Sequence, residues 1–355
     1  ITLAQDARFK GWDKNGDGML SREELPAQLR QNFDRVDSNN DGSISLSEHN
    51  AVAKRQGQRP PAAGRGVPEG IEVISSIDYV GAGNPRQELD IFLPEDTKSG
   101  ELLPLIIFVH GGGWQKGSKE AAGRRLGPFV QSGKYAGAAI NYRLSDEAQW
   151  PLQIHDCKAA LRWLRGNAEK YGFDKEKFAV WGTSAGGHLV AMLGVSGEVT
   201  GVEGDLGEYD DESSRVQAVI DYFGPTDFLT MGKGEVIDHT APDSPEGKLL
   251  GGAPGEMEEV ARQASPVTHV TRDDAPHLIV HGDKDPLVPI AQSESYDQLL
   301  DAAGVESVFI RVEGGGHGQG FNNAMLEKKI AIFLERHLHE GTESVEEEVM
   351  KAEPR

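Results

Sequence analysis

The sequence is poor in cysteine, in long apolar runs and in positive charge. Cys157 is the only cysteine among 355 residues, so no intrachain disulfide can form. No stretch of roughly eighteen or more apolar residues occurs, so no membrane span is expected. The formal charge is −21. Nucleic acid and anionic lipid carry phosphate charges that such a protein would repel, so neither is an expected partner.

What remains is an ordinary globular composition, with 37% hydrophobic and 26% charged residues. The length suits one large α/β domain and a small module. The chain begins with Ile1 rather than methionine, which is typical of a processed or trimmed N-terminus.

Composition divides the chain into four regions. Residues 1–55 hold two similar helix–loop–helix units. Residues 56–69 are rich in Pro, Gly, Arg and Ala, which predicts an exposed linker. Residues 70–340 alternate between strand-like and helix-like segments. Residues 341–355 are Glu-rich with few apolar anchors, which predicts a disordered tail.

The third region is expected to form a doubly wound, mostly parallel eight-stranded sheet. Several apolar runs are continuous, which favours strands buried on both faces, and the clearest helical segments are 152–171, 291–303 and 323–337. The stretches 196–215 and 231–268 interrupt the pattern and are candidates for lid or cap segments over the ligand-binding edge. The eight expected strands are Ile71–Val80, Glu88–Leu93, Leu105–His110, Ala136–Tyr142, Phe178–Trp181, Gln217–Tyr222, His277–His281 and Ser307–Val312.

Two twelve-residue loops in the first region have the spacing of EF-hand calcium sites. Calcium prefers six to eight oxygen ligands; loop positions 1, 3, 5 and 12 supply side-chain oxygens and position 7 a backbone carbonyl. Leu20 and Ile44 stand at position 8, where the two loops can pair as a short β-bridge. We expect calcium in both loops, with a structural rather than catalytic role. The predicted ligands are Asp13, Asn15, Asp17, Met19 and Glu24 in one loop and Asp37, Asn39, Asp41, Ser43 and Glu48 in the other.

Around Ser184 the sequence has the features of a nucleophilic turn. An apolar strand leads into Gly182-Thr-Ser184-Ala-Gly186, and a helix-forming run follows. The glycines permit a tight strand-to-helix turn that exposes the serine hydroxyl. Earlier in the chain, an apolar strand is followed by the glycine-rich run His110-Gly111-Gly112-Gly113. Backbone amides there, with the amide of Ala185, predict an oxyanion hole.

A serine hydroxyl needs a base and an orienting acid, which in this arrangement follow it in chain order. Asp283 and Asp285 both follow the strand HLIVH, so either could be the acid. His317 lies in a glycine-rich loop after the next strand and is the predicted base. We expect the other candidates, His188, His281, His337 and His339, to be structural or solvated.

Several motifs in order resemble the α/β-hydrolases of the esterase/lipase superfamily, and most closely the bacterial carboxylesterases that include feruloyl and acetyl-xylan esterases. The motifs are HGGGWQKGSK (110–119), INYRLS (140–145), VWGTSAGGHL (180–189), YFGPTD (222–227), ASP (264–266), HGDKDPLVP (281–289) and GGGHG (314–318). This resemblance implies Ser184 as nucleophile, Asp285 as acid, His317 as base, and Gly112, Gly113 and Ala185 as oxyanion donors.

The predicted protein is therefore an α/β-hydrolase preceded by a small all-α EF-hand pair. The predicted activity is hydrolysis of carboxylic esters through an acyl-enzyme, on short-chain, aryl, feruloyl or acetyl esters, either small molecules or groups linked to polysaccharide. An amidase resembling arylformamidases, and a calcium-dependent binding module without catalysis, are the alternatives. Trp114, Trp150 and Tyr142 either line a substrate pocket or pack in the core. Calcium sites of millimolar affinity favour a periplasmic or secreted setting. The sequence does not specify an oligomeric state.

Overall fold

The chain folds into two compact units, Ile1–Gly64 and Arg65–Arg355. In this computed structural model, the described residues are 12–25, 33–37, 41–46, 48, 66–96, 100, 102–197, 199–234 and 236–353. Most of the predicted linker, residues 56–69, and the predicted ligand Asn39 lie outside these ranges.

The first unit has a small core beside a two-stranded ribbon. Strand β1 (Met19–Leu20) pairs antiparallel with β2 (Ile44–Ser45), and Leu20 lies opposite Ile44. The predicted bridge between the two calcium loops is thus confirmed. The short helix α2 (Phe33–Val36) adds Phe33 to a cluster with Leu20, Leu25 and Ile44. Among the described residues of this unit, the apolar core is small, so these residues contribute little stabilisation from apolar burial.

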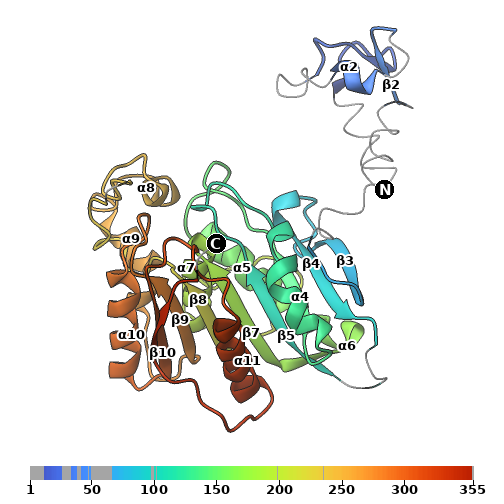
Figure 1. Ribbon diagram of the computed structural model, residues 1–355. Coiled ribbons are helices and arrows are strands. Elements are labelled where there is room, and N and C mark those ends of the chain that lie inside the picture. Colours follow the sequence, from blue (N-terminus) through green and yellow to red (C-terminus); the bar gives the residue numbers. More distant parts are fainter. Residues whose placement is uncertain are drawn as a thin grey trace. The chain divides into compact units, whose positions relative to one another are not determined.

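The second unit is built on a nine-stranded sheet in the order β11-β10-β9-β8-β7-β5-β6-β4-β3 (Figure 1). In this order, all neighbouring strands between β6 and β11, β5 included, are parallel. The pairs β3–β4 and β4–β6 are antiparallel. Every residue of β5, β6, β8 and β9 is buried, which is why these strands read as continuous apolar runs. The strands are β3 (Ile71–Asp78), β4 (Glu88–Pro94), β5 (Leu103–Val109), β6 (Ala136–Ile140), β7 (Phe173–Thr183), β8 (Ala218–Tyr222), β9 (His277–Gly282), β10 (Ser307–Glu313) and β11 (Glu348–Lys351).

Helices cover both faces of this sheet, as predicted for a doubly wound fold (Figure 1). One face of β5 packs with α5 and α7, and its other face packs with α4 and α11, because successive side chains of a strand point to opposite sides. Short 3₁₀ helices of the described connections are η3 (Pro85–Gln87), η4 (Lys119–Ala121) and η5 (Pro266–Thr268). The α-helices are α4 (Gly123–Gln131), α5 (Leu152–Gly166), α6 (Ala168–Tyr171), α7 (Ala185–Val195), α8 (Pro245–Leu250), α9 (Glu258–Ala264), α10 (Ala291–Ala303) and α11 (Ala324–Leu338).

The C-terminal segment departs from the prediction. The expectation of a disordered tail at 341–355 is wrong for its described part, because β11 extends the sheet parallel to β10. Met350 and Val345 are buried against the α11 side of the core, and Lys329 on α11 pairs with Glu348 at 2.7 Å. The free edge of β10 supplies the backbone partners, so few apolar residues suffice. The sheet therefore has nine strands instead of eight.

Candidate active site

Ser184 occupies the turn between β7 and α7, where the backbone is strained. Its φ is 56° and its ψ is −122°, a conformation rarely adopted by residues other than glycine. Its amide donates to the Tyr222 carbonyl at 2.8 Å, which ties the turn to β8. A Cβ atom on Gly182 would lie 2.0 Å from the carbonyl oxygen of Gly186. The two flanking glycines of the motif thus let the turn close tightly enough to present the serine.

The glycine loop after β5 lies beside this turn. Gly112 has φ of 125°, and a Cβ atom there would lie 2.1 Å from the Lys116 carbonyl oxygen, so only glycine fits. Within the described residues, the backbone amides of Gly112, Gly113 and Ala185 donate no hydrogen bond. All three residues line the same pocket as Ser184. This arrangement leaves three amide donors available for an oxygen that develops negative charge.

His317 and Asp285 form the second half of the site. The His317 Nδ1 atom lies 2.7 Å from Asp285 Oδ2, and His317 lines the pocket with Ser184. Asp285 Oδ1 accepts hydrogen bonds from the amides of Leu287 and Val288. Burial opposes ionisation of this carboxyl, but hydrogen bonds from His281, His317 and Val288 outweigh it and hold the pKa of Asp285 well below its usual range.

Of the two competing carboxylates, only Asp285 contacts His317. Asp283 instead accepts a hydrogen bond from the Gly314 amide at 2.7 Å and lies 3.6 Å from Arg311. It therefore braces the start of the histidine loop. No hydrogen bond joins Ser184 Oγ to His317 among the described residues; in resting sites this contact is often long and tightens when substrate binds.

The other histidines contact neighbouring residues rather than Ser184. His188 is buried, accepts from Trp114 Nε1 at 3.3 Å and lies 2.7 Å from the Ala264 carbonyl. Burial lowers the pKa of His188 to about 4. His281 lies 3.4 Å from Asp285 and 2.7 Å from Ser293 Oγ, so it helps to hold the acid in place. His337 on α11 lies 3.5 Å from Glu306.

The pocket over Ser184 has a volume of about 750 Å³. Trp114 is among the lining residues but is buried and donates to His188, and Tyr142 is buried and donates to the His110 carbonyl. Trp150 is also buried and donates to Gln263 at 3.0 Å, so it packs in the core.

Of the two predicted cap segments, only 231–268 contributes to this pocket. Its Ile237, His239, Pro245 and Glu246 form part of the lining. The described part of 196–215 packs elsewhere: Glu203 pairs with Lys158 at 2.6 Å and Arg162 at 2.7 Å on α5.

Sequence reasoning missed the buried pair His239 and Glu246 in this cap. Their side chains meet at 2.9 Å, and His239 Nε2 lies 3.0 Å from the Leu287 carbonyl. Burial disfavours the charged form of His239, but its hydrogen bond to the Glu246 carboxylate outweighs burial and raises the pKa of His239. Two polar residues seven positions apart in a Gly- and Pro-rich stretch carry no recognisable spacing signal.

In the first EF-hand loop, backbone amides and a serine hydroxyl hold the carboxylates of two predicted ligands. Asp13 accepts from the Gly16 and Gly18 amides at 2.8 and 2.9 Å, which holds its carboxylate within the loop. Glu24, at loop position 12, accepts from the Ser21 amide at 2.8 Å and from the Ser21 hydroxyl at 2.7 Å, and these bonds lower its pKa.

The second loop repeats this pattern. Asp37 accepts from Gly42 at 2.9 Å, and Glu48 accepts from the Ser45 amide at 3.0 Å. Two loops that present carboxylates at equivalent positions fit a hard cation such as calcium.

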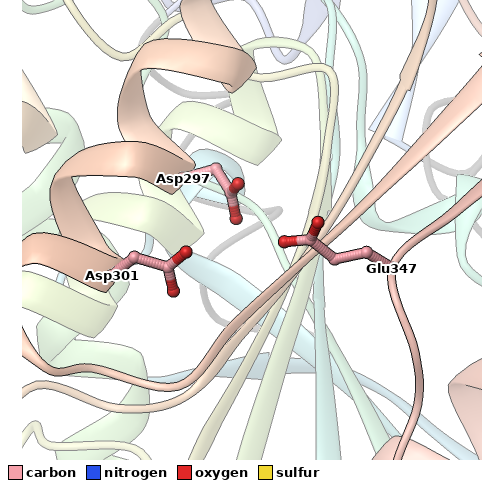
Figure 2. Close-up of side chains that lie close together, drawn as sticks. All are labelled: Asp297, Asp301 and Glu347. Carbon is pink, nitrogen blue, oxygen red and sulfur yellow. The ribbon is translucent and has the colours of Figure 1, made fainter.

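A separate group of carboxylates lies at the far edge of the second unit. Figure 2 shows Asp297 and Asp301 of α10 pointing toward Glu347, which precedes β11. Burial raises the pKa of Asp297 to about 6, and the nearby charges of Glu347 and Asp301 add to this effect. Ser307 donates to Asp297. The charges of these acids repel one another, so they oppose the approach of the segment before β11 to α10 unless a proton or a cation neutralises them.

Comparisons with known proteins agree with this geometry. The BD-FAE family matches residues 89–300, and EF-hand matches cover residues 6–26 and 29–50. Esterase LipC of Mycobacterium tuberculosis is 32% identical over 259 residues, which are 71% of this chain and 62% of that protein. The chain thus spans about three-fifths of the length of this curated relative.

Two solved structures are also similar. A truncated form of a carbohydrate esterase from gut microbiota has a TM-score of 0.71 and 34% identity, covering 77% of this chain and 99% of that one. A bifunctional GH43-CE protein of Bacteroides eggerthii has a TM-score of 0.70 and 33% identity, covering 75% of this chain and 35% of that one. None of the helices in the described ranges is long and apolar enough to cross a membrane. The chain belongs to the BD-FAE family of α/β-hydrolases, with an EF-hand region ahead of the hydrolase domain.

Proposed function

We propose that this protein is a serine esterase that hydrolyses carboxylic esters through an acyl-enzyme. The observation that carries the proposal is the contact of 2.7 Å between Asp285 and His317, with His317 and Ser184 lining one pocket together with three uncommitted backbone amides. The similarity to proteins described as esterases supports it.

The geometry suggests the course of the reaction. The ionised Asp285 accepts a hydrogen bond from the Nδ1–H group of His317, which leaves Nε2 free to take the proton of Ser184. Ser184 Oγ then attacks the ester carbonyl, and the amides of Gly112, Gly113 and Ala185 stabilise the oxyanion. The alcohol leaves with the proton from His317. A water molecule, deprotonated by His317, attacks the acyl-enzyme and releases the acid.

The proposed substrates are short-chain, aryl, feruloyl or acetyl esters, free or linked to a polysaccharide. The pocket of about 750 Å³ can hold an aromatic acyl group or a sugar ring, and the half-buried Ile237 and Leu287 supply apolar surface. The related structures described as carbohydrate esterases support the polysaccharide-linked class. An amidase of arylformamidase type is the competing enzyme class, and a binding module without catalysis is the competing non-enzyme class.

We also propose that calcium binds both EF-hand loops and stabilises the first unit. The loop carboxylates and the backbone carbonyls of Met19 and Ser43 would hold the ion. Bound calcium would offset the repulsion among these carboxylates and order the loops. We further propose a periplasmic or secreted setting, where calcium is plentiful. Cell fractionation followed by immunoblotting tests this, and recovery in the cytosolic fraction would contradict it.

The experiment that tests the function compares wild type with Ser184→Ala on p-nitrophenyl acetate, methyl ferulate and a formyl-anilide. We expect wild type to hydrolyse the esters and Ser184→Ala to lose at least about a thousandfold in kcat/KM. Preferential hydrolysis of the anilide would favour the amidase. A wild type that hydrolyses none of them, and does not react with an organophosphonate at Ser184, would favour the binding module.

A further inference from the structure

Arg125 on α4 places a guanidinium group in the wall of the catalytic pocket. It lines the pocket together with Ser184, His317 and Phe223. Its Cζ atom lies 4.9 Å from the centre of the Tyr222 ring and 5.5 Å from that of Trp181. Tyr222 ends β8, and Trp181 lies three residues before Ser184 on β7. Arg125 is thus held by aromatic faces at the sheet edge that carries the nucleophile.

Arg125 differs from three other inward-facing arginines of the described residues, because it has neither a carboxylate partner nor a backbone carbonyl partner. Arg143 pairs with Asp156 at 2.7 Å, Arg162 pairs with Glu203 at 2.7 Å, and Arg165 donates to backbone carbonyls. Among the described residues, no carboxylate lies within 4.0 Å of the Arg125 guanidinium. Glu327 interacts with it electrostatically from a greater distance, and the Glu327 side chain is exposed to solvent.

Burial lowers the pKa of Arg125, yet an arginine starts so far above neutrality that it stays charged. In place of water, the Arg125 guanidinium has two aromatic faces and the neutral Tyr222 hydroxyl, which is a weaker acceptor for it than a carboxylate. An anionic ligand in the pocket would restore the missing hydrogen bonds.

The remaining charges of the pocket do not supply that anion. Among the described lining residues, Glu246 is the only carboxylate, and it is already paired with His239 at 2.9 Å. Lys116 adds a second positive charge at the rim. The pocket is therefore cationic in a protein whose formal charge is −21. A local positive site within an acidic surface selects for one anionic group at one position rather than for polyanions.

We propose that Arg125 binds a carboxylate of the substrate, so that the preferred esters carry a carboxylate close to the ester bond. This inference rests on the proposed esterase function and narrows its substrate class. The carboxylate can belong to the acyl half, as in a half-ester of a dicarboxylic acid, or to the alcohol half, as in an ester of an acidic sugar. Guanidinium forms paired hydrogen bonds with a carboxylate in either case.

The test measures kcat/KM on two matched substrate pairs with wild type, Arg125→Gln and Arg125→Lys. For the alcohol half, 4-acetoxybenzoate is compared with 4-acetoxybenzamide; for the acyl half, p-nitrophenyl hydrogen adipate is compared with p-nitrophenyl hexanoate. We expect the ratio of anionic to neutral substrate to fall about tenfold or more in Arg125→Gln for at least one pair, with a smaller fall in Arg125→Lys. The pair that responds identifies the half that carries the carboxylate.

Arg124→Gln is the matched control, because Arg124 is the exposed neighbour on α4 and does not line the pocket. It should leave both ratios unchanged. Calorimetry with wild type provides a second measurement that needs neither turnover nor a folded variant: benzoate should bind about tenfold more tightly than benzamide.

Each outcome separates this inference from the proposed function. Suppose that the neutral esters are hydrolysed, that Arg125→Gln leaves the anionic-to-neutral ratios of kcat/KM unchanged, and that benzoate and benzamide bind equally well. This result would overturn the carboxylate site and leave the esterase function intact. No hydrolysis of any ester, together with selective benzoate binding, would remove the esterase function and keep the anion site.

Discussion

At the scale of single residues, two aspartates of one loop have opposite environments. Asp285 is enclosed by His317, His281 and two backbone amides, whereas Asp283 points to the amide of Gly314 and to Arg311. Although they are only two positions apart, Asp285 can orient His317, whereas Asp283 only braces the loop that carries it. Motif spacing alone left both open, and the family resemblance favoured Asp285.

This difference predicts the effect of two equivalent substitutions. Asp285→Asn should lower kcat on p-nitrophenyl acetate by about 10³- to 10⁴-fold, because an amide does not hold His317 in the tautomer that accepts the serine proton. Asp283→Asn should change kcat less than about threefold, since the amide oxygen can still accept from Gly314. Circular dichroism of both variants checks that they fold. Similar losses in the two variants would contradict the assignment of Asp285.

At the scale of elements, the cap segment is joined to the loop of Asp285 by one histidine. Both ring nitrogens of His239 face acceptors, Glu246 on one side and the Leu287 carbonyl on the other. Both contacts are hydrogen bonds only when the ring carries two protons, which fits its raised pKa. The Leu287 amide in turn donates to Asp285. The charge of His239 therefore helps to fasten the cap beside the catalytic acid.

This fastening predicts a stability that depends on pH. Because the pKa of His239 is higher in the folded state, its charge contributes to the free energy of unfolding. This contribution is complete below the pKa of the unfolded state, about 6.5, and is lost as pH rises through the higher pKa of the folded state. His239→Gln should therefore remove roughly 1.5 kcal/mol of unfolding free energy at pH 6 and much less at pH 9. Urea unfolding of both proteins at the two pH values measures it.

The control for this experiment is His155→Gln, which removes a histidine of α5 that lies outside the cap lining. In His155→Gln, the free energy of unfolding should still fall between pH 6 and pH 9, as it does in wild type. A difference between wild type and His239→Gln that stays constant from pH 6 to pH 9 would show that packing, rather than charge, fastens the cap.

The C-terminal segment shows where prediction by element type fails. Its charge and its shortage of apolar residues resemble those of disordered tails, and these local properties are correct. Strand β11 forms nevertheless because β10 presents an unpaired edge and a hydrophobic site for Met350. A strand that depends on a partner formed elsewhere in the chain cannot be recognised from its own composition.

At the scale of the whole molecule, the two units differ in how much of their stability can come from apolar burial. The first unit has four buried apolar residues among those described, whereas the second has several extensive clusters. Calcium should therefore matter for the fold of the first unit and little for the catalytic site. Its chelation should expose residues 12–48 to protease while hydrolysis of p-nitrophenyl acetate changes less than about twofold.

The double variant Glu24→Gln and Glu48→Gln should reproduce the effect of the chelator, because it removes the bidentate ligand of each loop. Glu23→Gln changes the adjacent glutamate, which is not an expected ligand, and should bind calcium normally by calorimetry. A parallel loss of calcium and of esterase activity would show that the two units are coupled.

The sequence by itself determined the features that depend on short spacings: the two calcium loops, the turn at Ser184, the glycine loop and the alternation of strands and helices. These patterns lie within twelve residues or within one strand-to-helix connection, so local geometry is enough to define them. The doubly wound sheet followed from the repetition of such units.

Only the tertiary structure decided which distant residues meet. Asp285 and His317 lie 32 positions apart, and Arg125 shares the pocket with His239 of the cap, more than a hundred residues later. These meetings depend on the order β10-β9-β8-β7-β5 in the sheet, which brings the ends of separate strands to one edge. Contacts set by strand order have no fixed separation in the chain; the family resemblance pointed to Asp285 and His317, but nothing in the sequence indicated that Arg125 and His239 line the same pocket.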